Sequence, residues 1–159
     1  KIPAVLSLRT LGVWEKPDQV GGNTRTFAPK HELFLHLAKD TAIFDADAIR
    51  VPYGARAAQG VAKKANRVGG WQPNVLGARQ GNILRVVGDR HTTKVLGRTQ
   101  TNKHPCIKPK GLLETLVKSC SSVGGIVYEP FVGSDNLKEV CGLLERDYYG
   151  CSDAQEFAC

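Results

Sequence analysis

Hydrophobic and polar residues follow regular patterns in the first third of the chain. Residues 4–16 alternate over part of their length and are rich in Val, Leu and Trp, which predicts a strand that ends at Pro17. Residues 31–39 fit a strand or a helix by pattern alone, but their shortness and apolar density favour a buried strand. A turn-rich connection between the two predicts a hairpin. Residues 44–53 indicate a turn of helix stopped before Pro52.

The last third alternates helix and strand patterns. Residues 110–119 predict a helix that packs on a sheet, because its apolar residues share one face: Leu112, Leu113, Leu116 and Val117. Gly124 and Gly125 end it and lead into a short apolar strand that opens into a glycine-containing turn. Residues 136–146 predict a second helix and residues 147–153 a second strand. This order is typical of a parallel sheet with crossover helices, which binds ligands at the carboxyl ends of its strands.

Glycine and basic residues dominate the middle of the chain, 54–103, where ten Lys and Arg residues accompany a single acid, Asp89. Trp71 and His91 lie among these charges and could stack on bases or sugars. Two interpretations stay open from the residues alone, a surface that contacts nucleic acid and a solvated, flexible linker. The candidate contact residues are Arg56, Lys63, Lys64, Arg67, Arg79, Arg85, Arg90, His91, Lys94 and Arg98.

Composition narrows the classes of protein. A chain of 159 residues with 42% hydrophobic content can build one globular core, and its net charge of +7 favours anionic partners. The five scattered cysteines form no metal-binding pattern, so we expect free thiols, no metal and a cytoplasmic protein. No apolar run reaches the ~20 residues that span a bilayer, so we expect no membrane partner. The chain begins at Lys1 and contains no Met, which suggests a fragment.

The turn at Gly133 and Ser134 is the strongest candidate for chemistry. It follows a strand and leads straight into a helix, so backbone N–H groups and the positive helix end would face a ligand, and the small residues would let it approach. Taken alone, the same turn also fits an ordinary strand-to-helix connection.

Residues 104–134, HPCIKPKGLLETLVKSCSSVGGIVYEPFVGS, resemble a joined block of DNA N4-cytosine and N6-adenine methyltransferases, which runs HPTQKP, helix, strand and DPFxGSGTT. The likeness continues into RDYYGCSDAQEF, which is similar to the family's R-x-Y-x-G strand. It also extends backwards, because LSLRTLGVWEKPD and RTFAPKHELFLHLAK are similar to two earlier strands of the family and FDADAIRVPY to the segment that follows them. The basic middle matches only in position and length.

The resemblance implies an α/β fold, the Rossmann-like fold of methyltransferases that depend on S-adenosylmethionine, in the permuted order. Residues 1–53 would be the hairpin and end of the catalytic half, 54–103 the target-recognition region that contacts double-stranded DNA, and 104–159 the cofactor-binding half. The chain would belong to an enzyme that transfers a methyl group to the exocyclic amine of adenine (N6) or cytosine (N4) in DNA.

Position by position, the resemblance places S-adenosylmethionine against His104, Pro105, Lys108, Pro109, Glu129, Pro130, Phe131, Gly133, Ser134, Ser152 and Asp153. Lys108 would offer its charge to the cofactor carboxylate; alternatively it is a solvated lysine before a helix. No catalytic residue is assigned.

Three departures from the family pattern matter. Asp135 stands where the family has a glycine, and the acidic position that holds the ribose falls on Ser152, with Asp153 next to it. The catalytic D/S-PP-Y/W tetrapeptide is absent from these residues. Because its strand lies between the hairpin and the cofactor strand in the family, we expect an incomplete fold, with unpaired strand edges and unmatched apolar faces, that is inactive alone. The missing catalytic half or a partner subunit would complete it.

Two other functions stay open. A degenerate relative would keep the DNA-binding surface and do no chemistry, as Asp135 and Ser152 suggest. An unrelated α/β enzyme would carry the Gly–Ser turn by chance.

Overall fold

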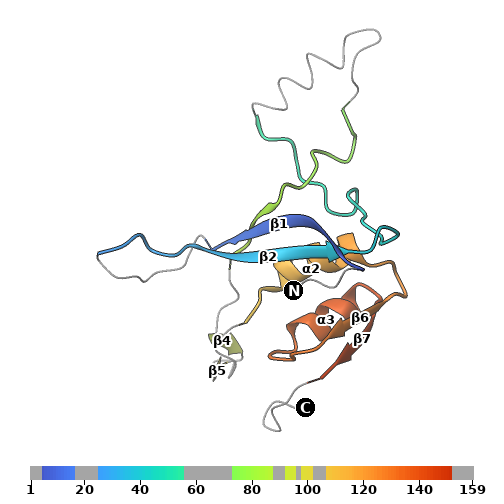
Figure 1. Cartoon of the computed structure of the whole chain (residues 1–159). Helices are drawn as coiled ribbons and strands as arrows, with labels where there is room; N and C mark the ends of the chain where they lie inside the picture. Colours follow the sequence, from blue (N-terminus) through green and yellow to red (C-terminus); the bar gives the residue numbers. More distant parts are fainter. Residues whose placement is uncertain are drawn as a thin grey trace.

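A computed structural model describes residues 5–16, 25–55, 73–87 and 107–151, together with the backbone of 92–95 and 98–101 (Figure 1). The elements in chain order are β1 (Ser7–Glu15), β2 (His31–Ala38), β3 (Ile83–Arg85), β4 (Thr92–Val95), β5 (Arg98–Thr101), α2 (Lys110–Cys120), β6 (Ile126–Glu129), α3 (Asn136–Leu143) and β7 (Asp147–Gly150). None of the helices in these ranges combines the length and the apolar character that crossing a membrane requires.

β1 lies in the middle of a three-stranded sheet with the order β2–β1–β3. It pairs antiparallel with β2, which confirms the predicted hairpin, and parallel with β3. Gly12 of β1 stands opposite Phe34 of β2, whose ring fills the space that a side chain on Gly12 would need. β3 lies in the basic middle of the chain, where the sequence predicted no strand, because three residues are too short to show a period of two.

The prediction of a buried strand at 31–39 is right for the strand and wrong for the burial. The side chains of Leu33 and Leu35 are 61% and 56% exposed. Side chains alternate between the faces of a sheet, and the register puts these two leucines on the same face as Leu11 and Ile83, both also exposed. Helix α2 covers the opposite face, so β2 is buried on one side only within the described residues.

The prediction of a helical turn at 44–53 is wrong. The segment forms turns and bends and ends in an isolated bridge between Val51 and Ala78. The carboxylate of Asp45 accepts hydrogen bonds from the backbone N–H groups of Asp47 and Ala48, at 2.9 and 3.0 Å. An aspartate that binds the backbone two and three residues later closes a local turn in place of a helix.

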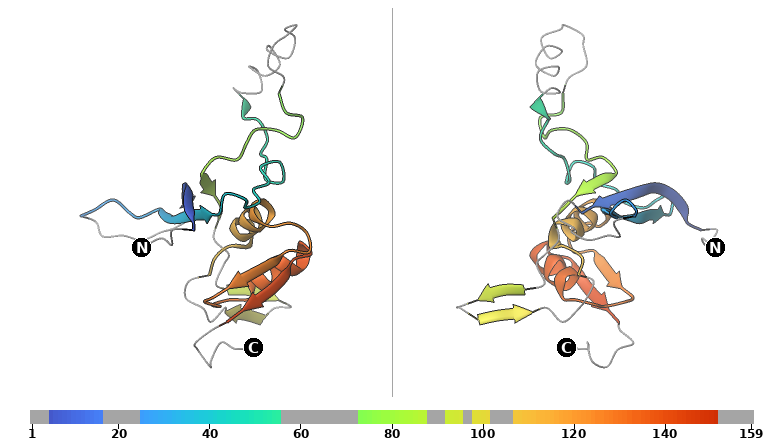
Figure 2. Two further views of the ribbon diagram at one scale, coloured as in Figure 1. Left: turned by 45° about the vertical axis from the view of Figure 1, so that its right-hand side comes forward. Right: turned by 90° about the vertical axis from the view of Figure 1, so that its left-hand side faces the viewer.

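Helix α2 lies between the two larger parts of the structure and contributes to both cores (Figure 2). Leu112 packs with Trp14 and Leu84 under the three-stranded sheet. Val117, on another side of the helix, packs with Val140 and Cys141 of α3. The predicted helix is confirmed, but its apolar residues serve two neighbours instead of one, so α2 joins the hairpin to the C-terminal unit.

The C-terminal unit is the predicted strand–helix–strand motif. β6 and β7 are parallel neighbours, and α3 connects them as a crossover helix. Gly124 adopts a left-handed conformation (φ 70°) in the turn before β6, and its N–H donates to the carbonyl of Glu145 at 2.8 Å. Val140 and Cys141 are completely buried, so α3 shields one face of the pair.

The three-stranded sheet and the β6–β7 pair both end on strands that have no further strand beyond them in the described ranges. β2 is an edge of the first sheet and β6 an edge of the second, and each carries exposed apolar side chains, among them Leu33 of β2 and Ile126 of β6. Unpaired edges and unmatched apolar faces are what the sequence predicted for a fold without its central strands. β4 and β5 form a separate antiparallel pair inside the basic region.

Candidate functional site

The carboxyl ends of β6 and β7 meet where the sequence predicted a site. Glu129 pairs with Gly150, the last residue of β7. The backbone N–H of Cys151 donates to the Glu129 carbonyl, and the N–H of Val132 donates to the Cys151 carbonyl, both at 3.0 Å. The turn at 130–135 is therefore folded against the end of β7 before it enters α3.

The carboxylate of Glu129 is held from the neighbouring strand. The hydroxyl of Tyr148 donates to Glu129 Oε2 at 2.8 Å. Burial raises the pKa of Tyr148, and the hydrogen bond and negative charge of Glu129 raise it further, so the phenol remains a donor. A Cβ on Gly150 would overlap the Tyr148 hydroxyl and Val132, so the glycine leaves room for this contact.

Cys151 stands at the mouth of the same end of the sheet. It is exposed, its thiol donates to the Pro130 carbonyl at 3.2 Å, and its sulfur lies 3.0 Å from the Tyr128 hydroxyl. That hydrogen bond raises the pKa of Tyr128. Phe131, the residue after Pro130, has 81% of its surface exposed.

The turn enters α3 without a side-chain cap. Asp135 is the N-cap residue, and its side chain makes no capping hydrogen bond to the first turn of α3. Backbone N–H groups at such a helix start are the kind of donors that bind anions. Its backbone (φ −73°, ψ 0°) is ordinary, so the glycine of the family pattern is not required here for conformation. Asn136, which is buried, donates from Nδ2 to the carbonyl of Lys108 at 2.8 Å and brings that segment beside the turn.

The side chain of Lys108 points to the hairpin. Its Nζ lies 3.0 Å from Glu32 Oε2 of β2 and 5.6 Å from the centre of the Trp14 ring. Lys16 pairs with the other oxygen of Glu32 and lies 4.7 Å from the same ring centre. Burial alone would raise the pKa of Glu32, but the hydrogen bonds from Lys16 and Lys108 outweigh it and hold the pKa below its ordinary value.

The other predicted residues divide into three groups. Lys108, Pro109, Glu129, Pro130, Phe131, Gly133 and Ser134 are described, and the Asn136 bond joins the segment of the first two to the turn of the others. Arg79 and Arg85 are described, and Arg85 makes a two-pronged ion pair with Glu15 at 2.8 and 3.0 Å. Only the backbone of Lys94 and Arg98 is described. The remaining predicted residues lie outside the described ranges: His104, Pro105, Ser152, Asp153, Arg56, Lys63, Lys64, Arg67, Arg90 and His91.

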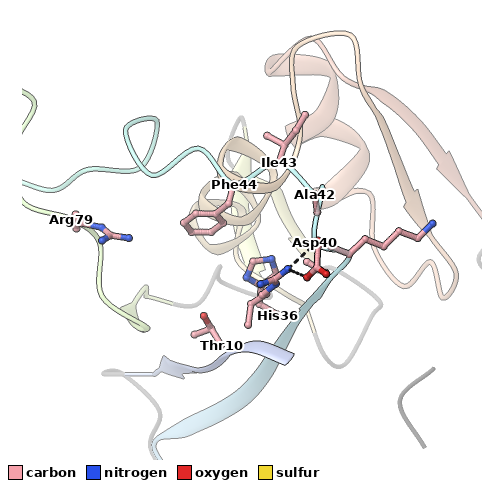
Figure 3. A pocket seen from close by; sticks show the side chains of 10 residues that line it. Thr10, His36, Asp40, Ala42, Ile43, Phe44 and Arg79 are labelled. Carbon is pink, nitrogen blue, oxygen red and sulfur yellow. Dashed lines mark hydrogen bonds and ion pairs between the residues drawn. The ribbon is translucent and has the colours of Figure 1, made fainter. Parts of the chain in front are cut away.

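Two adjoining hollows of about 370 and 390 Å³ lie elsewhere, under the hairpin near the end of α2. His36 stacks on Phe44 with 5.4 Å between ring centres, and Arg79 lines both hollows (Figure 3). Cys120, the last residue of α2, lines the larger one. Lys110, at the other end of α2, pairs with Glu139 in the first turn of α3. The hollows and the turn at 130–135 therefore lie near opposite ends of α2.

A family model described as DNA methylase matches residues 6–159. The chain belongs to the DNA methylase family. The match confirms the resemblance drawn from the 104–134 block and excludes a Gly–Ser turn carried by chance in an unrelated enzyme.

Curated relatives of this DNA methylase chain include Type II methyltransferases. M1.MboII of Moraxella bovis is 30% identical over 151 residues, which cover 91% of this chain and 57% of that protein. M.HpaI of Haemophilus parainfluenzae is 30% identical over 138 residues, which cover 86% of this chain and 38% of that protein. The chain thus spans between about two fifths and three fifths of their length.

Solved structures show the same fold. The chain matches a cytosine-N4-specific PvuII DNA methyltransferase with a TM-score of 0.63 and 14% identity, over 96% of this chain and 49% of that one. It matches M1.HpyAVI in complex with SAM with a TM-score of 0.56 and 18% identity, over 96% and 59%. The described strands and helices are accordingly part of the Rossmann-like methyltransferase fold.

Sequence reasoning missed the residues that hold the site residues in place. Tyr148, Asn136 and Glu32 contact residues that lie 19, 28 and 76 positions away in the chain. A signal exists only for Glu32, the one acid in the mainly apolar strand β2.

Proposed function

We propose that this chain supplies the cofactor-binding part of a DNA methyltransferase that uses S-adenosylmethionine to methylate an exocyclic amine, N6 of adenine or N4 of cytosine. The observation that carries the proposal is the turn at 130–135, which joins the carboxyl end of β6 to an uncapped α3 beside the held carboxylate of Glu129. In a parallel α/β unit this is where ligands bind.

The groups at this end fit the chemistry of the cofactor. S-adenosylmethionine carries an ammonium, a carboxylate and a sulfonium, so its methionine end needs an anion and N–H donors. Glu129 supplies the anion, and the first turn of α3 supplies the N–H groups and a partial positive charge. Phe131, between these two in the chain, offers exposed apolar surface. When bound, the cofactor would supply the activated methyl group; the residues of this chain hold and orient it.

The remaining predicted cofactor residues complete the proposal. Gly133 and Ser134 keep the turn small, while Pro130 and Pro109 stiffen its two sides. The segment that contains His104 and Pro105 would close the site from the α2 side, and Ser152 or Asp153 would reach the ribose. Residues 104–105 and 152–153 lie outside the described ranges.

The catalytic strands would come from the missing half of the protein or from a partner subunit. β2 and β6 each have one edge without a neighbouring strand in the described ranges, and both strands carry exposed apolar side chains. Strands inserted between them would pair these edges and, with their helices, cover Leu33, Leu35 and Ile126. Such an insertion joins the two separate sheets into one, with the hairpin at one end and the β6–β7 pair at the other.

Double-stranded DNA is the proposed substrate, and the basic region 54–103 its contact surface. Among the described candidates, Arg79 is exposed and can meet a phosphate, whereas Arg85 is already paired with Glu15. The distinction predicts that Arg79 contributes more to the salt dependence of DNA binding than Arg85 does.

Methyl transfer is measured on the complete polypeptide that the gene encodes, with methyl-labelled S-adenosylmethionine and double-stranded DNA. The DNA is then hydrolysed and its bases are separated. Labelled N6-methyladenine or N4-methylcytosine is the expected result. Absence of both, with S-adenosylmethionine still bound, would favour the degenerate relative that binds DNA and does no chemistry. Absence of cofactor binding as well would contradict the proposal.

A further inference from the structure

Lys108 joins three parts of the molecule. Its side chain reaches β2 through Glu32, its ammonium lies near the Trp14 ring of β1, and its carbonyl accepts from Asn136 at the start of α3. The contacts span residues 76 positions apart on one side and 28 on the other. A single residue before α2 thereby connects the hairpin to the turn at 130–135.

The anchor at the hairpin end is well held. Glu32 accepts from Lys16 as well as from Lys108, and Trp14 is itself fixed by a bond from Nε1 to the Val86 carbonyl at 2.9 Å. Trp14 is only 5% exposed. Two ammonium groups near one aromatic ring and one carboxylate between them form a compact cluster with little freedom to rearrange.

The contact of Lys108 with α3 is also held in place. Asn136 is 8% exposed, and its amide donates to a backbone carbonyl, so movement of the 107–109 segment is transmitted to the first turn of α3. Pro109 follows directly and is fully buried, which leaves the segment little room to move by itself. The Glu32–Lys108–Asn136 connection is therefore continuous from the hairpin to the turn.

We propose that Lys108 is a positioning residue, which Glu32 of the hairpin and Asn136 of α3 use to fix the turn for the cofactor, and that its ammonium does not bind the cofactor carboxylate. The inference rests on the proposed function. Because the ammonium is directed to Glu32, loss of Glu32 loosens the turn, and the cofactor must then order it on binding.

The alternative gives opposite results. If Lys108 bound the cofactor carboxylate, Glu32 would compete for the same ammonium, and removing Glu32 would leave cofactor affinity unchanged or improve it. Removing Lys108 would then weaken only those ligands that carry a carboxylate. Under the positioning role, both substitutions weaken binding irrespective of that carboxylate.

The experiment titrates S-adenosylmethionine and its decarboxylated analogue by calorimetry into the complete polypeptide. Glu32→Gln and Lys108→Met are compared with wild type and with Glu15→Gln, a matched control that breaks the Glu15–Arg85 ion pair of the same hairpin. We expect Glu32→Gln and Lys108→Met each to weaken both ligands about three- to tenfold, and the double variant to lose no more than either alone. The control should stay within about twofold of wild type.

Thermal melts of each variant show whether it is folded. If Glu32→Gln is not folded, Lys108→Met decides the question, because the Lys108 side chain is 42% exposed and Met keeps an unbranched apolar chain in its place. Weakening confined to the ligand with a carboxylate, or tighter binding by Glu32→Gln, would overturn the positioning role while leaving the proposed function intact. Wild type that binds neither ligand would overturn the proposed function instead, and this inference with it.

Discussion

The hydrogen bond from Tyr148 to Glu129 makes a specific prediction about cofactor affinity. In Tyr148→Phe the ring stays and the donor to the carboxylate is lost. A hydrogen bond to a charged group contributes about 1.5 to 3 kcal/mol, and both residues here are only half-buried, so we take about 1 kcal/mol. That free energy corresponds to about fivefold weaker binding of S-adenosylmethionine.

The matched control for this substitution is Tyr149→Phe, because Tyr149 is the next residue of β7, faces the other side of the strand and is 59% exposed. Calorimetric titration of the complete polypeptide should show wild-type affinity for this control. Gly150→Ala should weaken binding at least as much as Tyr148→Phe, since its Cβ would push the Tyr148 hydroxyl away from Glu129. Equal affinities for wild type and Tyr148→Phe would refute the reasoning that Glu129 needs this donor.

The pKa of Tyr148 sets the pH window of that contact. Folding raises the pKa of Tyr148 above its unfolded value of about 10. The stability that the protonated phenol contributes is therefore complete below about pH 10 and is lost only as pH rises through the folded pKa. The difference in free energy of unfolding between wild type and Tyr148→Phe should therefore be the same at about pH 7 and pH 9.

Three further experiments test the fold. Gly12→Ala should lower the free energy of unfolding by about 1 to 3 kcal/mol in urea melts, because the new methyl group meets the Phe34 ring; an unchanged midpoint would speak against that packing. Wild type should lose stability as pH falls from about 4.5 through the lowered pKa of Glu32, and Glu32→Gln should lose less over that range. Parallel curves of unfolding free energy against pH for the two proteins would argue against the Glu32–Lys16–Lys108 cluster. Val140→Ala should cost about 2 kcal/mol, since Val140 is completely buried, while the exposed Val123→Ala should cost under about 0.5 kcal/mol; similar costs would contradict the assigned core.

Much of the fold could be predicted from local patterns. The helices α2 and α3 follow from a period of 3.6, and β1 from partial alternation. The strands β2 and β6 follow from short, dense apolar runs between turn signals. The burial of β2 could not, because it depends on what covers each face of the sheet, and Leu33 shows that one face is uncovered in the described residues. The turn at 44–53 could not be predicted from periodicity either, because it depends on hydrogen bonds from the backbone to the Asp45 carboxylate.

The place of the proposed site in the fold was predictable from one segment of the sequence. Glu129 and the turn that follows it came from a contiguous block, and the structure places them at the carboxyl end of β6. Their supports come from distant parts of the chain, such as Glu32 for Lys108, and no pattern within one segment encodes such a contact. Asp135 is a different case: the sequence marked it as a departure, and its ordinary backbone angles show that its conformation does not require glycine.

Cys151 offers the most direct test of the central claim, that the carboxyl ends of β6 and β7 hold the cofactor. Its exposed thiol lies at that end, whereas Cys120, also exposed, lies at the far end of α2 and serves as the internal reference. The complete polypeptide is treated with N-ethylmaleimide with and without S-adenosylmethionine, and alkylation of each cysteine is followed by mass spectrometry. The account predicts that the cofactor slows alkylation of Cys151 and leaves that of Cys120 unchanged; equal rates at Cys151 with and without saturating cofactor would contradict it.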